Sequence, residues 1–134
     1  MNERVRRFAA EWVRPWFGFW DKEAEVLGHP VAIEDHADPT WQPPDKASLI
    51  EYLRASPAAL VGQVEEQPCR RCGRPIHPAL YLSDGDLLWT DSAAHLVEHH
   101  DFVLPDHFVR AIRSRHYTPP EDIDPGALDR LWPQ

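Results

Sequence analysis

Near the start of the chain, apolar side chains recur at steps of three and four residues, the spacing of one face of a helix. The set comprises Val5, Phe8, Ala9, Trp12 and Trp16. Pro15 has no backbone N–H and removes the helical hydrogen bond to Glu11, so we expect a kink or a break there. The pattern predicts an amphipathic N-terminal helix whose aromatic face packs on a core or, alternatively, forms part of an oligomer interface.

Three further elements are predicted in the segment after this helix. Residues 31–33 are apolar and form a candidate short strand within a proline-rich loop. Asp45 is a suitable cap for a helix over residues 46–54, and Pro57 lies just beyond its end. Residues 60–64 fit a strand. The buried face of the helix is expected to consist of Leu49, Ile50 and Leu53.

The second half of the chain contains a clear hairpin signal. Two apolar runs, 80–82 and 87–89, are joined by Ser83-Asp84-Gly85-Asp86. An Asp-Gly pair between apolar runs favours a tight turn, because glycine adopts the backbone angles that such turns require. The sequence therefore predicts two antiparallel strands here.

Three helices are predicted after the hairpin. Residues 93–99 have helical spacing, and Asp91 or Ser92 is expected to cap this helix. The segment Leu104-Pro105-Asp106 opens a second helix, and residues 127–132 form a short third one. The inward-facing residues of the second helix are expected to be Phe108, Val109 and Ile112.

Together these elements predict an α+β fold. N-terminal amphipathic helices pack on a small antiparallel sheet that includes the β-hairpin, and two C-terminal helices complete the core. We expect one domain over residues 1–134, because 134 residues can bury a modest core without disulfides. Within it we expect an N-terminal helical part (about 1–56), a cysteine, hairpin and two-helix module (about 58–116), and a proline-rich acidic tail (117–134).

Charge and hydropathy narrow the classes of function. The net charge of −8 disfavours nucleic acid as the main partner, because binding to phosphates requires a basic surface. No apolar run approaches the roughly 20 residues of a membrane span. The basic N-terminus lacks an uninterrupted apolar stretch, which disfavours a signal peptide, so we expect a cytoplasmic protein with reduced thiols. The six tryptophans must be buried or serve as contacts.

Cys69 and Cys72 are the only cysteines and form a C-x-x-C-G motif. Such a turn can direct two thiolates at one metal ion, and zinc prefers tetrahedral nitrogen and sulfur ligands. The motif predicts a structural zinc site. Two alternatives stay open: an ordinary turn with unliganded cysteines, and a redox or catalytic thiol. A redox C-x-x-C motif normally lies between a strand and a helix, whereas this motif precedes a strand and a hairpin.

Several histidines could complete the zinc site. His95 and His99 are four residues apart and would share a helix face. The pair His95 and His100 requires the helix to end near Glu98. His77, four residues after the second cysteine, is a third contender. The residues alone leave these alternatives open.

The region from Cys69 to Ile112 resembles a family of small bacterial proteins without an established activity. The resemblance rests on Cys69-Arg70-Arg71-Cys72-Gly73, Ser83-Asp84-Gly85, Trp89, Ala94-His95-Leu96-Val97, His100 and Leu104-Pro105-Asp106-His107-Phe108. It covers about a third of the chain, and it departs from the family at Thr90-Asp91-Ser92, where proline and glycine are usual. The resemblance implies that the C-terminal module is a fold unit. It also implies that His95 and His100 join the two cysteines as metal ligands.

Three hypotheses of function follow. The first is a small cytoplasmic protein-binding or accessory module with a closed structural zinc site and an aromatic surface for a protein partner or for self-association; an acidic immunity or inhibitor protein is one version. The second is a small metal-dependent enzyme with water as the remaining ligand. The third is nucleic-acid binding through Arg70, Arg71 and Arg74, which the overall charge opposes. No catalytic residue is predicted, and we lean towards a protein that is not an enzyme.

Overall fold

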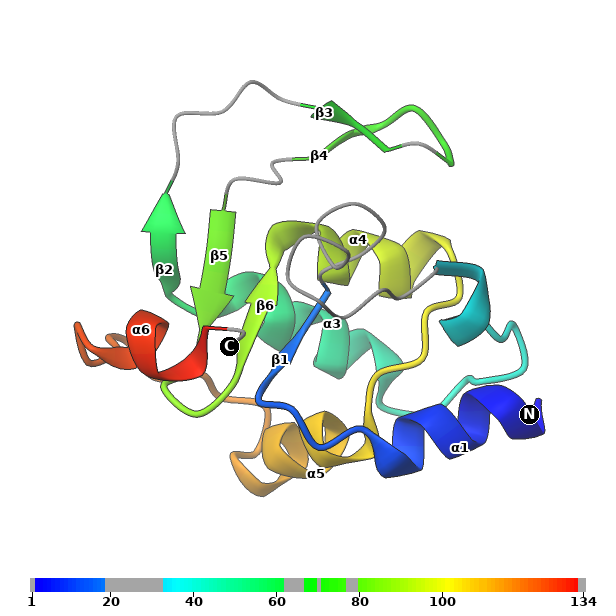
Figure 1. The fold of residues 1–134 in the computed structure, drawn as a ribbon, viewed down its shortest axis with the longest axis horizontal. Helices are drawn as coiled ribbons and strands as arrows, with labels where there is room; N and C mark the ends of the chain where they lie inside the picture. Colours follow the sequence, from blue (N-terminus) through cyan, green and yellow to red (C-terminus); the bar gives the residue numbers. More distant parts are fainter. Residues whose placement is uncertain (1, 19–32, 62–66, 70, 77–79, 133–134) are drawn as a thin grey trace.

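The computed structural model describes residues 2–18, 33–61, 67–69, 71–76 and 80–132 (Figure 1). The predicted α+β fold is confirmed. A four-stranded sheet has the strand order β1-β6-β5-β2, and β3 and β4 form a separate pair. The elements are α1 (Glu3–Glu11), β1 (Trp16–Phe17), the 3₁₀ helix η1 (Ile33–His36), α3 (Lys46–Ala55), β2 (Ala58–Val61), β3 (Gln67–Pro68), β4 (Pro75–Ile76), β5 (Leu80–Ser83), β6 (Leu88–Thr90), α4 (Asp91–His99), α5 (Asp106–Ser114) and α6 (Ala127–Leu131).

The sheet is mixed, which corrects the prediction of an antiparallel one. Helix α1 ends at Glu11, before Pro15, and the chain continues extended so that β1 pairs with β6 in parallel. The carbonyl of Pro15 accepts a hydrogen bond of 2.8 Å from the backbone N–H of Leu88. Trp16 therefore lies in a strand instead of continuing the helical face. The predicted break at the proline is where the chain changes from helix to strand.

The predicted hairpin is present. Strands β5 and β6 pair antiparallel, with Leu82 opposite Trp89. Gly85 in the turn has a positive φ of 96°, which costs a residue without a Cβ little. Asp84 is buried and accepts hydrogen bonds from the backbone N–H groups of Asp86 and Leu87 through one carboxylate oxygen. These bonds fix the turn.

One large hydrophobic cluster joins the sheet to helices α3, α4 and α5. The side chains predicted to face inward on α3 and α5 are buried: Leu49, Ile50, Leu53, Phe108, Val109 and Ile112. Trp89 is fully buried at the centre, and its indole N–H donates to the carbonyl of Leu53 at 3.0 Å. In Figure 1, α3 passes behind the sheet, α4 runs from the end of β6 to the right of it, and α1 and α5 lie below it.

The helix caps differ in detail from the prediction. Asp45 holds the N-cap position of α3 but makes no side-chain capping bond. Its carboxylate instead accepts hydrogen bonds from the guanidinium of Arg113 and the hydroxyl of Tyr117. Helix α4 begins at Asp91, with Thr90 at the N-cap, so neither predicted cap occupies that position. The Thr90 hydroxyl donates to the carbonyl of Gly18 at 2.8 Å, which ties α4 to the chain after β1.

Two predicted strands differ from the observed structure. Ile33 lies in η1 and not in a strand, and residues 31–32 fall outside the described residues. Strand β2 starts at Ala58, two residues earlier than predicted, and pairs antiparallel with β5. Residues 62–64 of the predicted strand also lie outside the described residues.

The β3–β4 pair stands apart from the four-stranded sheet. Figure 1 shows it above α4, on the side away from α5. Its register places Gln67 opposite Ile76 and Pro68 opposite Pro75, so the short antiparallel pair closes around the cysteine turn. Below we call residues 67–76 the knuckle, and the sheet with its helices the body.

Candidate metal centre

The knuckle holds its two cysteines in a hydrogen-bonded turn. The backbone N–H of Cys69 donates to the carbonyl of Arg74 at 2.7 Å, and the N–H of Gly73 donates to the carbonyl of Cys69 at 2.8 Å. Gly73 has a positive φ of 74°, a conformation that favours glycine. The C-x-x-C-G spacing therefore produces a closed turn that carries both thiols.

The end of α4 supplies the histidines. His95 lies within the helix, and His100 follows its last residue with a non-helical φ of −131°. The backbone N–H groups of His100 and Phe102 both donate to the carbonyl of Leu96, and Asp101 has a positive φ of 59°. Phe102 then pairs with Ala37 in a β-bridge. This sharp ending directs the His100 ring towards the same side as His95.

Four side chains meet between the knuckle and α4. One donor atom from each of Cys69, Cys72, His95 and His100 lies within 4.8 Å of the other three. The Cys69 sulfur is 3.4 Å from Nε2 of His100, and the Cys72 sulfur is 3.3 Å from Nε2 of His95. Zinc bond lengths in a tetrahedral site place sulfur and nitrogen ligands about 3.5 Å apart. The four residues are thus close enough to hold a metal ion.

The centre is buried on one side and open on the other. Cys69 and His95 are buried and His100 is half-buried, whereas Cys72 is exposed. Burial raises the pKa of the Cys69 thiol, but the backbone N–H groups of Arg71 and Cys72 and the nearby Cys72 thiol and Arg71 charge outweigh it. The net result is a pKa below the usual value, because these groups stabilise a thiolate.

The two histidines favour their neutral form. Burial lowers the pKa of His95, and the neighbouring His100 and His99 lower it further. Burial likewise lowers the pKa of His100, together with the positive charge of Arg71. A neutral imidazole and a thiolate are the forms that coordinate metals, so the protein environment favours the metal-binding forms of Cys69, His95 and His100.

The ring nitrogens of His99 contact Glu98 and Arg74 instead of the cysteines. Its Nε2 lies 2.7 Å from a carboxylate oxygen of Glu98, and Nη1 of Arg74 lies 2.9 Å from its Nδ1. Nη1 of Arg74 lies equally 2.9 Å from Nε2, so Glu98 and Arg74 together contact both ring nitrogens. The structure therefore brings His100, and not His99, to the cysteines. His77 lies outside the described residues.

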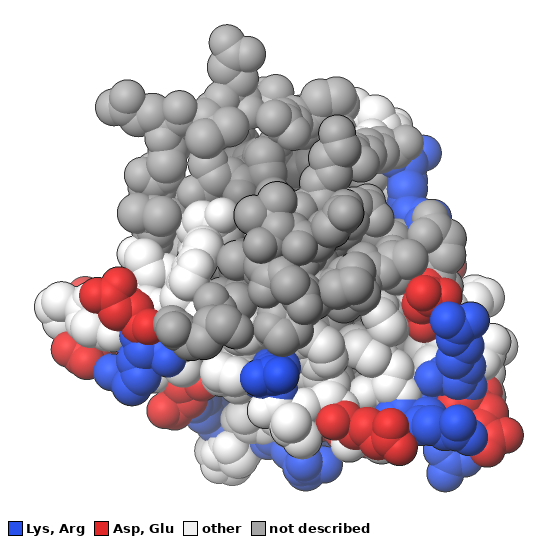
Figure 2. All heavy atoms as spheres, in the orientation of Figure 1, with Lys and Arg blue, Asp and Glu red and all other residues white. Residues whose placement is uncertain are grey.

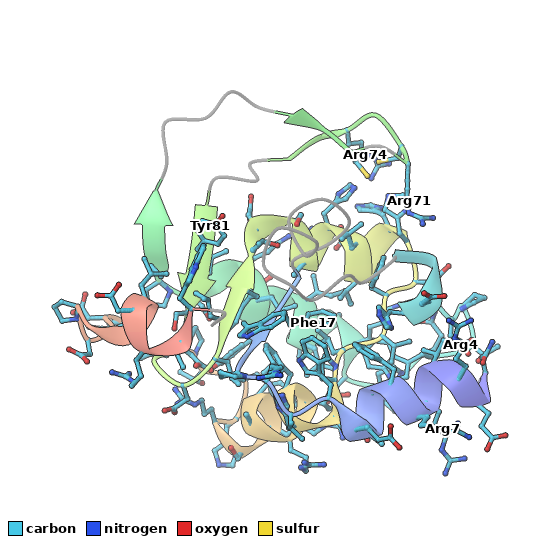
Figure 3. All side chains as sticks on the ribbon, in the orientation of Figure 1. Arg4, Arg7, Phe17, Arg71, Arg74 and Tyr81 are labelled. Atoms are coloured by element: carbon cyan, nitrogen blue, oxygen red, sulfur yellow. The ribbon has the colours of Figure 1, made fainter. Side chains whose placement is uncertain are left out.

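Sequence reasoning missed the chain of polar contacts behind the centre. Arg54 on α3 forms two hydrogen bonds of 3.0 Å with Glu98, which contacts His99, which in turn contacts Arg74 on the knuckle. Figure 3 shows Arg71 and Arg74 on the knuckle beside the end of α4. Arg54 and Glu98 are 44 residues apart, and no spacing in the sequence signals such a pair.

Comparisons with known proteins give no match. No protein-family model fits the chain, and neither a curated protein nor a solved structure matches it. The resemblance to a bacterial family thus stays a prediction. Within the described part of the chain, no helix combines the length and apolar character needed to cross a membrane. Figure 2 shows acidic and basic side chains interspersed along the lower rim of the body.

Proposed function

We propose that the chain is a small protein-binding or accessory module stabilised by one structural zinc ion. The observation that carries the proposal is the meeting of four donor atoms from the knuckle and α4 within 4.8 Å. Zinc would join two parts of the chain that are 23 to 31 residues apart in sequence. A cross-link of this kind stabilises the folded state, because the unfolded chain does not present the four ligands together.

The donor set favours zinc over other metals. Two thiolates and two imidazoles match the borderline-soft, tetrahedral preference of Zn²⁺. Calcium and magnesium require oxygen ligands, and none of the four side chains offers one. The short sulfur–nitrogen distances of 3.3 and 3.4 Å need only a small adjustment to surround a zinc ion.

A structural role follows from the number of protein ligands. Catalytic zinc sites typically have three protein ligands and keep a fourth position for water or substrate. Here four side chains would supply all four ligands of a tetrahedral site. The supported role is therefore to hold the knuckle against α4, with recognition left to the protein surface.

The outer face of the sheet is the surface we assign to a protein partner or to self-association. Trp12, Tyr81 and Trp132 are half-buried around buried Trp16. Tyr81 and Trp132 meet edge to face with ring centroids 5.1 Å apart. Large aromatic side chains that are only partly buried are enriched in protein interfaces. Analytical ultracentrifugation of the wild type and of Tyr81→Arg tests self-association, which the substitution should weaken. If the wild type is a monomer at all concentrations, self-association is excluded and a different protein is the partner that this face would bind.

Native mass spectrometry and elemental analysis test the zinc site. We expect about one zinc ion per chain, which a strong chelator removes. His95→Ala and His100→Ala should both lose the metal. His99→Ala is the matched control, because this histidine lies in the same helix but its nitrogens contact Glu98 and Arg74. A folded wild-type protein without metal, or a His99→Ala variant that loses zinc as fully as His95→Ala, contradicts the proposal.

A metal-dependent enzyme is the second candidate, and the exposure of Cys72 favours it. An exposed ligand can be replaced by water or substrate, which would open the site. Cobalt substitution separates the two functions, since the visible spectrum of Co²⁺ reports its ligands. Added azide should leave the spectrum unchanged in a closed structural site. A spectral shift that saturates with azide would favour the enzyme.

A further inference from the structure

The cysteine ligands and the histidine ligands belong to different elements. Both sulfurs lie in the knuckle, and both imidazoles lie at the end of α4. None of the described side chains between Cys69 and Arg74 belongs to a hydrophobic cluster of the body. The knuckle meets α4 through side-chain contacts with the histidines, including the contact between Arg74 and His99. A reaction that joins the two sulfurs would therefore act on the knuckle alone.

The two sulfurs are also placed for such a reaction. They are three residues apart in one turn and within 4.8 Å of each other. The sulfurs must approach to about 2 Å to form a disulfide, and the following Gly73 tolerates the change of backbone angles that this requires. Cys72 is exposed and Cys69 is buried, so a small oxidant reaches the Cys72 sulfur first.

We propose that hydrogen peroxide converts Cys69 and Cys72 to a disulfide, releases the zinc and thereby detaches the knuckle from α4. This inference rests on the proposed zinc site. The Cys72 thiolate attacks peroxide, the O–O bond breaks, and a sulfenic acid and one hydroxide ion form. The Cys69 thiolate then attacks the sulfenic sulfur, an S–S bond forms, and a second hydroxide leaves. Two electrons pass from the two sulfurs to peroxide, so the reaction is balanced.

Loss of the sulfurs removes half of the zinc ligands in one step. His95 and His100 alone leave two of the four tetrahedral positions without a protein ligand, and the ion dissociates. The helix and its core remain in place, because Leu96 and Val97 are buried on α4 independently of the knuckle. A thiol reductant reverses the disulfide, and zinc can then bind again. The centre would thus act as a reversible peroxide switch that controls one surface element.

The test treats the zinc-loaded wild-type protein with hydrogen peroxide in the presence of a chromogenic zinc chelator too weak to remove the metal by itself. We expect release of about one zinc ion per chain and a mass about 2 Da below that of the reduced zinc-free chain. The chain has only two cysteines, so this mass change assigns the disulfide, whereas oxidation of the single Met1 adds mass instead. Reductant and zinc should restore both the mass and the metal.

The outcomes separate this inference from the proposed function. Zinc bound in the untreated protein but retained after peroxide, or released with Cys72 as a sulfinic or sulfonic acid, overturns the switch and leaves the structural site standing. A protein that contains no zinc before treatment overturns both. Hydrogen exchange supplies the structural readout: residues 67–76 should lose protection on oxidation while β5 and β6 keep theirs. Equal loss of protection in β5 and β6 would contradict release of the knuckle alone.

Discussion

The body and the knuckle of this protein are stabilised in different ways. The body buries a continuous cluster around Trp89, and buried polar groups pair within it; the hydroxyl of Tyr52, for example, donates to Asp84 at 2.7 Å. The knuckle has two two-residue strands and a turn whose cysteines face the histidines of α4. Short strands bury little apolar surface, and two-stranded pairs are marginally stable in water. In the proposed function, a zinc ion bound by Cys69, Cys72, His95 and His100 would hold the knuckle in place of a hydrophobic core.

Because of this difference, solution conditions that change the knuckle need not change the stability of the body. A hydrophobic core responds only weakly to small changes in solution chemistry, whereas a metal site depends on proton, metal and oxidant concentrations. In the proposed zinc site, the ligands come from a helix of the body and from a short turn, so the turn could change its state while the fold persists. Four measurements test whether the body and the knuckle differ in this way.

Trp89→Ala should have the largest effect on the body. The side chain is fully buried, contacts Tyr52 and Phe108, and donates its indole N–H to Leu53. Removing it leaves a cavity and an unpaired carbonyl, so we expect a loss of about 3–5 kcal/mol in the free energy of unfolding. Urea denaturation followed by far-UV circular dichroism measures it. Val13→Ala is the control, because Val13 is 82% exposed and should change stability little.

The elements of the body could be predicted because their signals are local. The Asp84-Gly85 turn identifies the hairpin, and helical spacing identifies the buried residues Phe108 and Ile112 of α5. The parallel pairing of β1 with β6 could not be predicted. It joins residues 72 positions apart through Trp16 and Leu88, and a two-residue strand has no periodicity to detect.

The residues alone predicted the candidate metal centre in part, whereas the family resemblance implied all four side chains that the structure brings together. The cysteine spacing indicates a metal turn directly, because both sulfurs come from one local motif. The choice between His99 and His100 depends on where α4 ends and on which partners occupy each ring. Asp101 in the left-handed region sets that ending, and the residues alone leave His99, His100 and His77 as alternatives. Tertiary contacts therefore decide the ligand set.

Acid should destabilise the body through His36, independently of the metal centre. Burial, partly opposed by the nearby Asp35 charge, lowers the pKa of His36 from 6.5 to about 4. Between these two pH values the unfolded chain binds a proton that the folded chain does not, so stability is full above pH 6.5 and falls as the pH drops towards 4. We expect this group to contribute a loss of up to about 3 kcal/mol.

The measurement is urea denaturation at several pH values in the presence of chelator, so that metal binding does not vary. His36→Asn should flatten the profile between pH 6.5 and 4 relative to the wild type. His116→Asn is the control, because His116 lies at the exposed end of α5. Parallel profiles for the wild type and His36→Asn would contradict a role of His36 in acid sensitivity.

Removing zinc should affect the knuckle more than the body. Under chelation we expect amide exchange in residues 67–76 to become at least about tenfold faster, because the ligands no longer hold the turn on α4. The amide of Trp89 in β6 should stay protected, since its cluster contains none of the metal ligands. Hydrogen-exchange mass spectrometry gives both values in one experiment. Exchange that rises equally in both segments would show that the knuckle and body unfold as one unit.

The smallest expected effect concerns the ion pair behind the centre. Arg54 and Glu98 join α3 to α4 with two hydrogen bonds of 3.0 Å, but both side chains are partly exposed, so solvent screens their attraction. A double-mutant cycle with Arg54→Ala and Glu98→Ala should give a coupling energy of about 0.5 kcal/mol in urea denaturation. All three variants should keep their zinc, because neither residue is a ligand. If Glu98→Ala instead releases zinc, the contact between Glu98 and His99 supports the metal centre. The residues that hold the knuckle on α4 would then include Glu98 as well as the ligands.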